Sequence, residues 1–105
     1  MHLRVASPGN RLKDSEIDRI QKDLEKIDRR LRRFDEVYAE VRINGGDAGS
    51  PTHHVTLEVE YGRHHHIAKA ESKDMGMAVR EAREEILRQI NDRSRGSHSE
   101  YSKGR

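Results

Sequence analysis

Lys22, Lys26, Arg29 and Arg33 recur at intervals of three and four residues, the spacing that brings side chains to one face of a helix. The same segment carries an apolar stripe at similar intervals: Ile17, Ile20, Leu24, Ile27, Leu31 and Phe34. At about 100° per residue, the four cations fall within a sector of about 60°, roughly opposite the centre of that stripe. Ammonium and guanidinium groups are cationic hydrogen-bond donors, so the chemistry that this face offers is the binding of a polyanion.

The cations of this face repel one another. Lys22 and Lys26 are four residues apart, as are Arg29 and Arg33, and three residues separate Lys26 from Arg29. Each such like-charge pair costs an isolated helix about 0.2–0.5 kcal/mol. The acids of the helix lie on the flanks between the two stripes: Asp18, Asp23, Glu25 and Asp28. A polyanion would compensate the repulsion, which favours nucleic acid as the partner. The alternative is an ordinary solvated helix face.

The composition is typical of one small folded domain. The chain has 105 residues, of which 31% are hydrophobic and 38% are charged, so it can bury only a modest core. It contains no cysteine, which excludes disulfides, thiolate metal ligands and thiol catalysis. Because there is no long apolar run, we expect no membrane span and no signal peptide. We expect a cytoplasmic, monomeric protein that needs no cofactor.

The charge is polarised along the chain, although the net charge is only +2. Residues 17–34 hold seven bases and four acids, a net +3, whereas residues 35–62 hold one base and six acids, a net −5. Residues 93–105 hold four bases and one acid, a net +3. A protein polarised in this way orients itself as it meets a charged partner.

Alternating apolar residues and turn residues predict the strands. They are expected at residues 2–7, 37–43, 55–61 and 64–72. The segment 44–52 is rich in Gly, with Asp, Ser and Pro, and predicts a flexible loop. Gly62 and Arg63 predict a tight turn between the last two strands.

Two amphipathic helices complete the order β-α-β-β-β-α. Ser15 and Asp18 form a predicted capping box for the first helix, which should end near Phe34. Asp74 is a favourable N-cap for the second, whose apolar stripe ends at Ile90. We therefore predict an α+β fold, a four-stranded mixed sheet with both helices packed on one face. The domain should span residues 1–92, followed by a flexible basic tail over 93–105.

Several short motifs support a family resemblance. The run from Ala68 to Met75 reads Ala-Lys-Ala-Glu-Ser-Lys-Asp-Met and is followed by Ala78-Val79 and Arg88-Gln89. The first predicted helix contains Leu24, Lys26 and Ile27. With the element order over roughly residues 3–92, these motifs resemble the bacterial ribosome hibernation-promoting factors, also called ribosome-associated inhibitors. The most specific part is the spacing from Asp-Met to Ala-Val and to Arg-Gln.

The resemblance implies a function. Such proteins bind the small ribosomal subunit in the mRNA and tRNA channel near the decoding centre, inhibit translation and protect idle ribosomes in stationary phase or stress. Lys26, with Arg29, and Arg88 occupy positions that are basic in the family. The residues expected to bind ribosomal RNA are Lys22, Lys26, Arg29, Arg30, Arg33, Arg88, Arg93 and Arg95.

The chain also departs from the family pattern. Asp23, Glu85 and Asp92 stand where relatives often carry Lys, and Gly76 replaces a usual Tyr. The second helix is therefore less basic than the family pattern. In this interpretation, the additional arginines of the first helix and the tail compensate for the missing positive charge: Arg30, Arg32, Arg33, Arg93 and Arg95. The chain resembles a short form, without the C-terminal extension of long family members.

Two other kinds of chemistry have little support. The histidines at 53, 54, 64, 65 and 66 could meet across a hairpin and bind zinc or copper. Strand alternation sends His65 to the opposite face from His64 and His66, so we expect no metal site. Ser, His and Asp occur at no recognisable catalytic spacing, and the acids and arginines of residues 80–88 form an ordinary salt-bridged helix face. We therefore expect a protein that is not an enzyme.

Two alternatives stay open. After the first strand, the order α-β-β-β-α matches that of double-stranded RNA-binding domains, so the chain could bind structured RNA in general. It could also be a protein-interaction module whose acidic middle, residues 35–62, binds a basic ribosomal protein. We expect stacking of RNA bases on aromatic side chains to contribute little in either case, because the chain has only one Phe and three Tyr.

Overall fold

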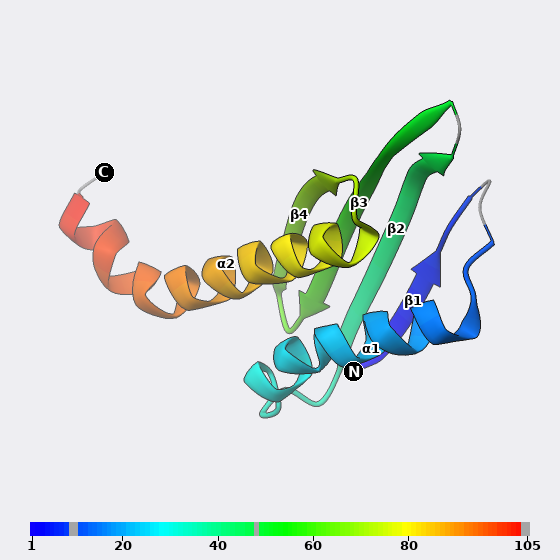
Figure 1. Cartoon of the computed structure of the whole chain (residues 1–105). Coiled ribbons are helices and arrows are strands. Elements are labelled where there is room, and N and C mark those ends of the chain that lie inside the picture. Colours follow the sequence, from blue (N-terminus) through cyan, green and yellow to red (C-terminus); the bar gives the residue numbers. More distant parts are fainter. Residues whose placement is uncertain (9–10, 48, 104–105) are drawn as a thin grey trace.

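The computed structural model describes residues 1–8, 11–47 and 49–103, without the side chains of residues 47, 50 and 93–103. The elements follow the predicted β-α-β-β-β-α order (Figure 1). They are β1 (His2–Ala6), α1 (Asp14–Arg30), β2 (Val37–Asp47), β3 (Ser50–Tyr61), β4 (His64–Ser72) and α2 (Met75–Lys103). The predicted α+β fold is confirmed.

The four strands form one mixed sheet in the order β1-β2-β3-β4. β1 runs parallel to β2, with Leu3 opposite Ala39, and the other neighbours are antiparallel. The parallel pair needs a crossover connection, which α1 supplies. Both helices lie on the same side of the sheet and run side by side in the same direction (Figure 1). The other side of the sheet is therefore left uncovered by the described elements.

The core lies between the helices and the covered face of the sheet. Alternate residues of β2 and β3 point into it, among them Val41 and Leu57, which are at most 1% exposed. Leu24 and Ile27 of α1 and Ile86 of α2 close the core from the helix side and are fully buried. Burial of one such side chain stabilises the fold by about 1.5–3 kcal/mol. The apolar stripe thus fixes which face of α1 points to solvent.

Both ends of α1 differ from the prediction. The helix begins at Asp14, and the Glu16 carboxylate accepts a hydrogen bond of 2.8 Å from the Lys13 backbone N–H, so the predicted Ser15–Asp18 capping box is wrong. The helix ends at Arg30, four residues before Phe34. There the Leu31 N–H is shared between the carbonyls of residues 27 and 28, a tightening typical of a last helical turn.

The predicted flexible loop over 44–52 is also wrong, because β2 and β3 extend into it as a long hairpin. Gly45 and Gly46 adopt φ angles of +83° and +80°, and the register shifts between Gly45 and Asp47. A Cβ atom at Gly45 would lie 2.1 Å from the backbone carbonyl oxygen of Thr52, so a side chain does not fit there. The glycines that suggested a loop instead supply a bulge within paired strands.

The Asp74 cap of α2 is confirmed, since its carboxylate accepts hydrogen bonds from the Gly76 and Met77 backbone N–H groups at 2.8 and 3.3 Å. The backbone of α2 continues to Lys103, past Arg93, where a tail without helix was expected. The side chains from Arg93 onward lie outside the described residues, so the flexibility of this segment stays a prediction. Within the described chain, neither helix combines the length and the apolar composition needed to cross a membrane.

Candidate nucleic-acid interface

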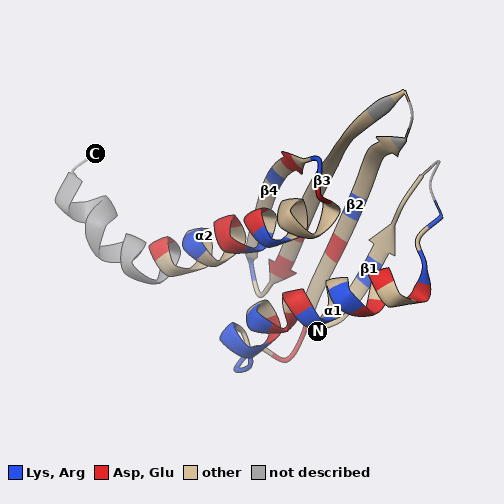
Figure 2. Ribbon diagram, in the orientation of Figure 1, with Lys and Arg blue, Asp and Glu red and all other residues tan. Residues whose placement is uncertain are grey.

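Three of the four cations singled out by their spacing lie on α1, and the fourth follows its C-terminal end. We call Lys22, Lys26, Arg29 and Arg33 the basic stripe; the first three are on α1 and Arg33 is in the turn that follows. All four are exposed, whereas Leu24 and Ile27 on the opposite side of the helix are fully buried. Figure 2 shows the concentration of Lys and Arg toward the C-terminal end of α1. The solvent exposure of all four residues agrees with the prediction, but Arg33 lies beyond the end of the helix and not on it.

Two acids on the flanks of α1 bind other parts of the protein and not the basic stripe. The Asp28 carboxylate lies 3.4 Å from the N-terminal ammonium group of Met1, and the Met1 side of this pair is largely buried. On the other flank, Asp23 faces the arginines of α2. These contacts anchor the helix on both sides, so the basic stripe is held outward on a supported backbone.

Little neutralises the basic stripe. The Arg29 guanidinium lies 3.9 Å from the Glu25 carboxylate, both about 60% exposed, and such surface pairs are worth little. The Arg33 guanidinium lies over the ring of Phe34, 5.3 Å from its centroid. Among the described side chains, no carboxylate lies within ion-pair distance of Lys22 or Lys26. These ammonium groups are available to a phosphate.

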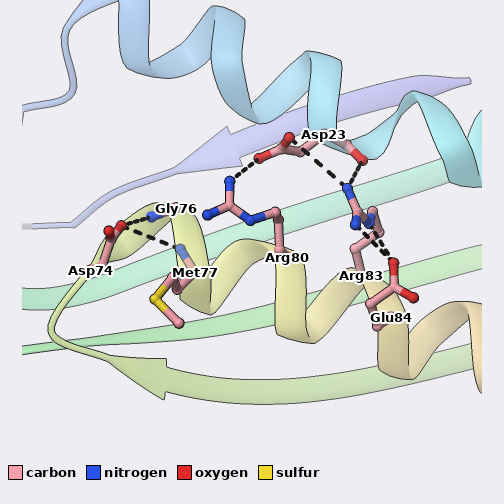
Figure 3. A network of polar contacts seen from close by, with 7 residues as sticks. All are labelled: Asp23, Asp74, Gly76, Met77, Arg80, Arg83 and Glu84. Carbon is pink, nitrogen blue, oxygen red and sulfur yellow. Dashed lines mark hydrogen bonds and ion pairs between the residues drawn. The ribbon is translucent and has the colours of Figure 1, made fainter.

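A network around Asp23 joins the two helices (Figure 3). The Asp23 carboxylate lies 3.9 Å from the Arg80 guanidinium and 4.0 Å from that of Arg83. Arg83 also donates a hydrogen bond of 3.2 Å to the Asp23 carbonyl and pairs with Glu84 at 2.8 Å. Because the Arg83 side chain is only 12% exposed, its charge serves the helix–helix contact. Sequence reasoning noticed Asp23 but missed this contact, because its partners lie about sixty residues away.

Arg88, a predicted RNA-binding residue, lies on α2 apart from the basic stripe and is paired twice. Its guanidinium nitrogens contact Glu85 at 2.5 Å and Asp92 at 2.8 Å, one turn away on either side. The hydrogen bond to Glu85 raises the pKa of Arg88 and lowers the pKa of Glu85. Arg88 and its two acids together carry a net negative charge, and the salt-bridged face predicted over residues 80–88 is confirmed for Arg88 and Glu85.

The remaining predicted residues lie at the edge of the interface or beyond the described side chains. Arg30 is exposed at the seam between the helices, where its Nε donates a hydrogen bond of 3.0 Å to the Asn91 side chain. The side chains of Arg93 and Arg95 lie outside the described residues. Of the eight predicted residues, the structure thus places Lys22, Lys26 and Arg29 exposed on α1, Arg33 exposed in the turn that follows, and Arg30 in contact with α2.

The histidines form separate pairs. The His66 ring is buried and shares a hydrogen bond of 2.8 Å with the Tyr61 hydroxyl, whereas His65 on the other face contacts Glu58 at 2.9 Å. The predicted alternation along β4 is confirmed. His54 lies 3.4 Å from Glu71. Within the described part of the chain, no three potential metal-binding side chains come together.

Comparisons with known proteins define the family. No curated protein sequence is significantly similar to the chain. Its fold is similar to that of the N-terminal domain of Protein Y from Thermus thermophilus, with a TM-score of 0.72 and 18% identity, covering 86% of this chain and 96% of that one. It is also similar to a ribosomal subunit interface protein from Coxiella burnetii, with a TM-score of 0.72 and 19% identity, covering 90% and 98%. The model of the family described as sigma 54 modulation protein / S30EA ribosomal protein matches residues 5–96, and the chain therefore belongs to that family.

Proposed function

We propose that the protein binds the small ribosomal subunit through ribosomal RNA near the decoding centre, in the channel that mRNA and tRNA occupy. It thereby inhibits translation and preserves idle ribosomes under stress or in stationary phase, as a cytoplasmic, ribosome-associated protein. The observation that carries this proposal is the basic stripe: four exposed cations, of which only Arg29 has a carboxylate within ion-pair distance among the described side chains. Membership of a family that includes a ribosomal protein supports the ribosome as the partner.

The mechanism is neutralisation of phosphates by the basic stripe. Each phosphate contact releases condensed counterions, so affinity falls steeply as salt rises, with little readout of base sequence. Specificity then comes from shape, because a folded ribosomal cleft presents phosphates at positions that a rigid helix can match. The contacts of Asp23 and Asp28 with neighbouring elements provide that rigidity. A domain seated in the channel would exclude mRNA and tRNA by occupying their place.

The interface is centred on α1. Arg30 extends the basic stripe toward the seam with α2, where Asn91 orients its guanidinium. Arg88 contributes less than the family pattern implies, because Glu85 and Asp92 already neutralise it. Arg93 and Arg95 belong to the proposed interface on the evidence of their charge alone.

Sedimentation with purified ribosomal subunits tests the proposal. The protein is mixed separately with small and large subunits and separated on sucrose gradients at low and at moderate salt. We expect association with the small subunit that weakens as salt rises, followed by competition with mRNA and tRNA for the same site. Equal association with both subunits and with any RNA duplex would indicate a general RNA-binding domain. Absence of association even at low salt would refute the proposal.

A further inference from the structure

None of the described helices covers the face of the sheet opposite α1 and α2 (Figure 1). Two of the three large hydrophobic residues that the described chain exposes lie there, Tyr38 at 49% and Ile67 at 45%. Tyr38 is held in place, because its ring stacks on His2 at 4.9 Å and its hydroxyl donates a hydrogen bond of 2.6 Å to Glu36. An aromatic ring held by two contacts is thus presented to solvent on this face of the sheet.

Carboxylates surround Tyr38 in an arrangement that works against the fold. Glu40 and Glu58 are directly opposite each other on β2 and β3, and Glu60 is directly opposite Tyr38. Like charges at directly opposite positions destabilise a sheet. Figure 2 shows these acids as red bands on the two central strands. A cationic partner would remove the repulsion.

The neighbouring cations compensate only part of this charge. Arg4 lies 3.7 Å from Glu40 but is itself 80% exposed, and His65 contacts Glu58. Among the described side chains, none lies within ion-pair distance of Glu60. Tyr38, Glu40, Glu58 and Glu60 line a shallow hollow between β1 and β3, whose β1 side is formed by His2 and Arg4. We call Tyr38 and the three glutamates the acidic sheet face.

We propose that the acidic sheet face docks an extended, arginine-bearing polypeptide segment that lies along β3. Glu58 and Glu60 are alternate residues on one face of β3, roughly 6.6 Å apart, which is also the spacing of alternate side chains in an extended peptide. A guanidinium group can pair with a carboxylate in a bidentate manner and can stack on an aromatic ring, so arginine suits both the glutamates and Tyr38. The face lies on the opposite side of the sheet from α1, so the basic stripe stays accessible while a segment is docked.

Fluorescence anisotropy tests this directly. The probe is a short labelled peptide with arginine at every second position, and the control peptide has the same composition with its arginines in one block. We compare the wild-type protein with Glu58→Gln/Glu60→Gln and with the matched α2 variant Glu81→Gln/Glu84→Gln. We expect the sheet variant to bind the alternating peptide roughly fivefold more weakly and the α2 variant to bind it unchanged. We also expect the block peptide to bind the wild-type protein less tightly than the alternating peptide.

Three results would overturn the proposal. The first is that the wild-type protein does not bind the alternating peptide. The second is that both variants lose affinity equally, which would indicate that the net charge of the protein attracts the peptide without a specific site. The third is that the wild-type protein self-associates and the sheet variant does not, which would indicate that a second copy of the protein occupies the acidic sheet face. Thermal unfolding of the sheet variant, which we expect to be undiminished because like-charge repulsion is relieved, excludes misfolding as the cause. The assay contains no ribosome and no RNA, so its outcome is independent of the proposed ribosome binding.

Discussion

The two helices both carry basic residues, yet among the described side chains only α1 carries lysines without a carboxylate within ion-pair distance. The ammonium groups of Lys22 and Lys26 on α1 have no described carboxylate nearby, whereas the described arginines of α2 all have one. The difference arises from the placement of acids. On α1 they lie on the flanks, and on α2 they lie one turn from Arg88 or beside Arg83. The comparison teaches that a count of cations does not identify an RNA-binding helix, because the position of the acids decides which charge remains available.

Reversal of charge in the basic stripe should have the largest effect on association with the small ribosomal subunit. We expect Lys26→Glu/Arg29→Glu to abolish association with the small subunit, because two phosphate contacts become repulsive. Since both side chains are exposed, the fold should be retained. Sedimentation on gradients measures association, and circular dichroism with thermal unfolding measures the fold. A folded variant that still sediments with the subunit would remove α1 from the interface.

The control for this variant is Lys69→Glu/Lys73→Glu, which makes the same charge change elsewhere. Both lysines are exposed, Lys69 on the uncovered face of the sheet and Lys73 beside the start of α2. We expect only a modest loss of association. Comparable losses in the two variants would mean that net charge, and not the basic stripe, governs binding.

Loss of the Asp23 carboxylate should affect stability more than any surface change. Asp23→Ala leaves the largely buried guanidinium of Arg83 without one of its two acids, and we expect a loss of about 1–3 kcal/mol in the free energy of unfolding. Urea unfolding of the single variants and of Asp23→Ala/Arg83→Met measures the coupling between them. Additive effects would show that the network does not hold the helices together.

Removal of the two carboxylates that pair with Arg88 should leave α2, like α1, with a cation that is available to a phosphate. We expect Glu85→Gln/Asp92→Asn to strengthen association with the subunit and to steepen its salt dependence by about one phosphate contact. Arg88→Ala in the wild-type background should change association little, because that charge is already neutralised. A large loss from Arg88→Ala would place α2 in the interface despite its acids.

The smallest expected effect is on the pH dependence of stability. The hydrogen bond from Arg88 lowers the pKa of Glu85 below its ordinary value of 4.5 in the folded state. The pair therefore stabilises the fold above the ordinary pKa, and this contribution is lost as the pH falls through the lowered one. Glu85→Gln lacks the pair at every pH, so the melting temperatures of the two proteins should converge in acid. A constant difference from neutral to acidic pH would contradict this account.

The features predicted correctly from the sequence depend on local spacing. The apolar stripe of α1, the alternation along β4 and the Asp74 cap each depend on intervals of two to four residues in the sequence. Local spacing also predicts the salt bridge between Glu85 and Arg88, as part of a salt-bridged helix face.

The features missed by the sequence depend on distant contacts or on backbone conformation. The contact of Asp23 with Arg83 joins residues far apart in the chain, so no local pattern could indicate it. Gly45 and Gly46 predict a loop because glycine has no side chain to indicate on which face of a strand it lies. The end of α1 depends on packing, since Leu31 is buried where the helix has already stopped.

The pairing of β1 has a consequence for the order in which the fold is completed. β2, β3, β4 and the start of α2 each contact a neighbour in the sequence, so this part of the sheet can assemble from hairpins. Among the described strands, β1 pairs only with β2, and its residues 2–6 are opposite residues 38–42, which follow α1 in the chain. During synthesis, β1 must therefore wait for β2 to emerge before it can join the sheet. The first strand to be made is the one whose place depends most on what is made later.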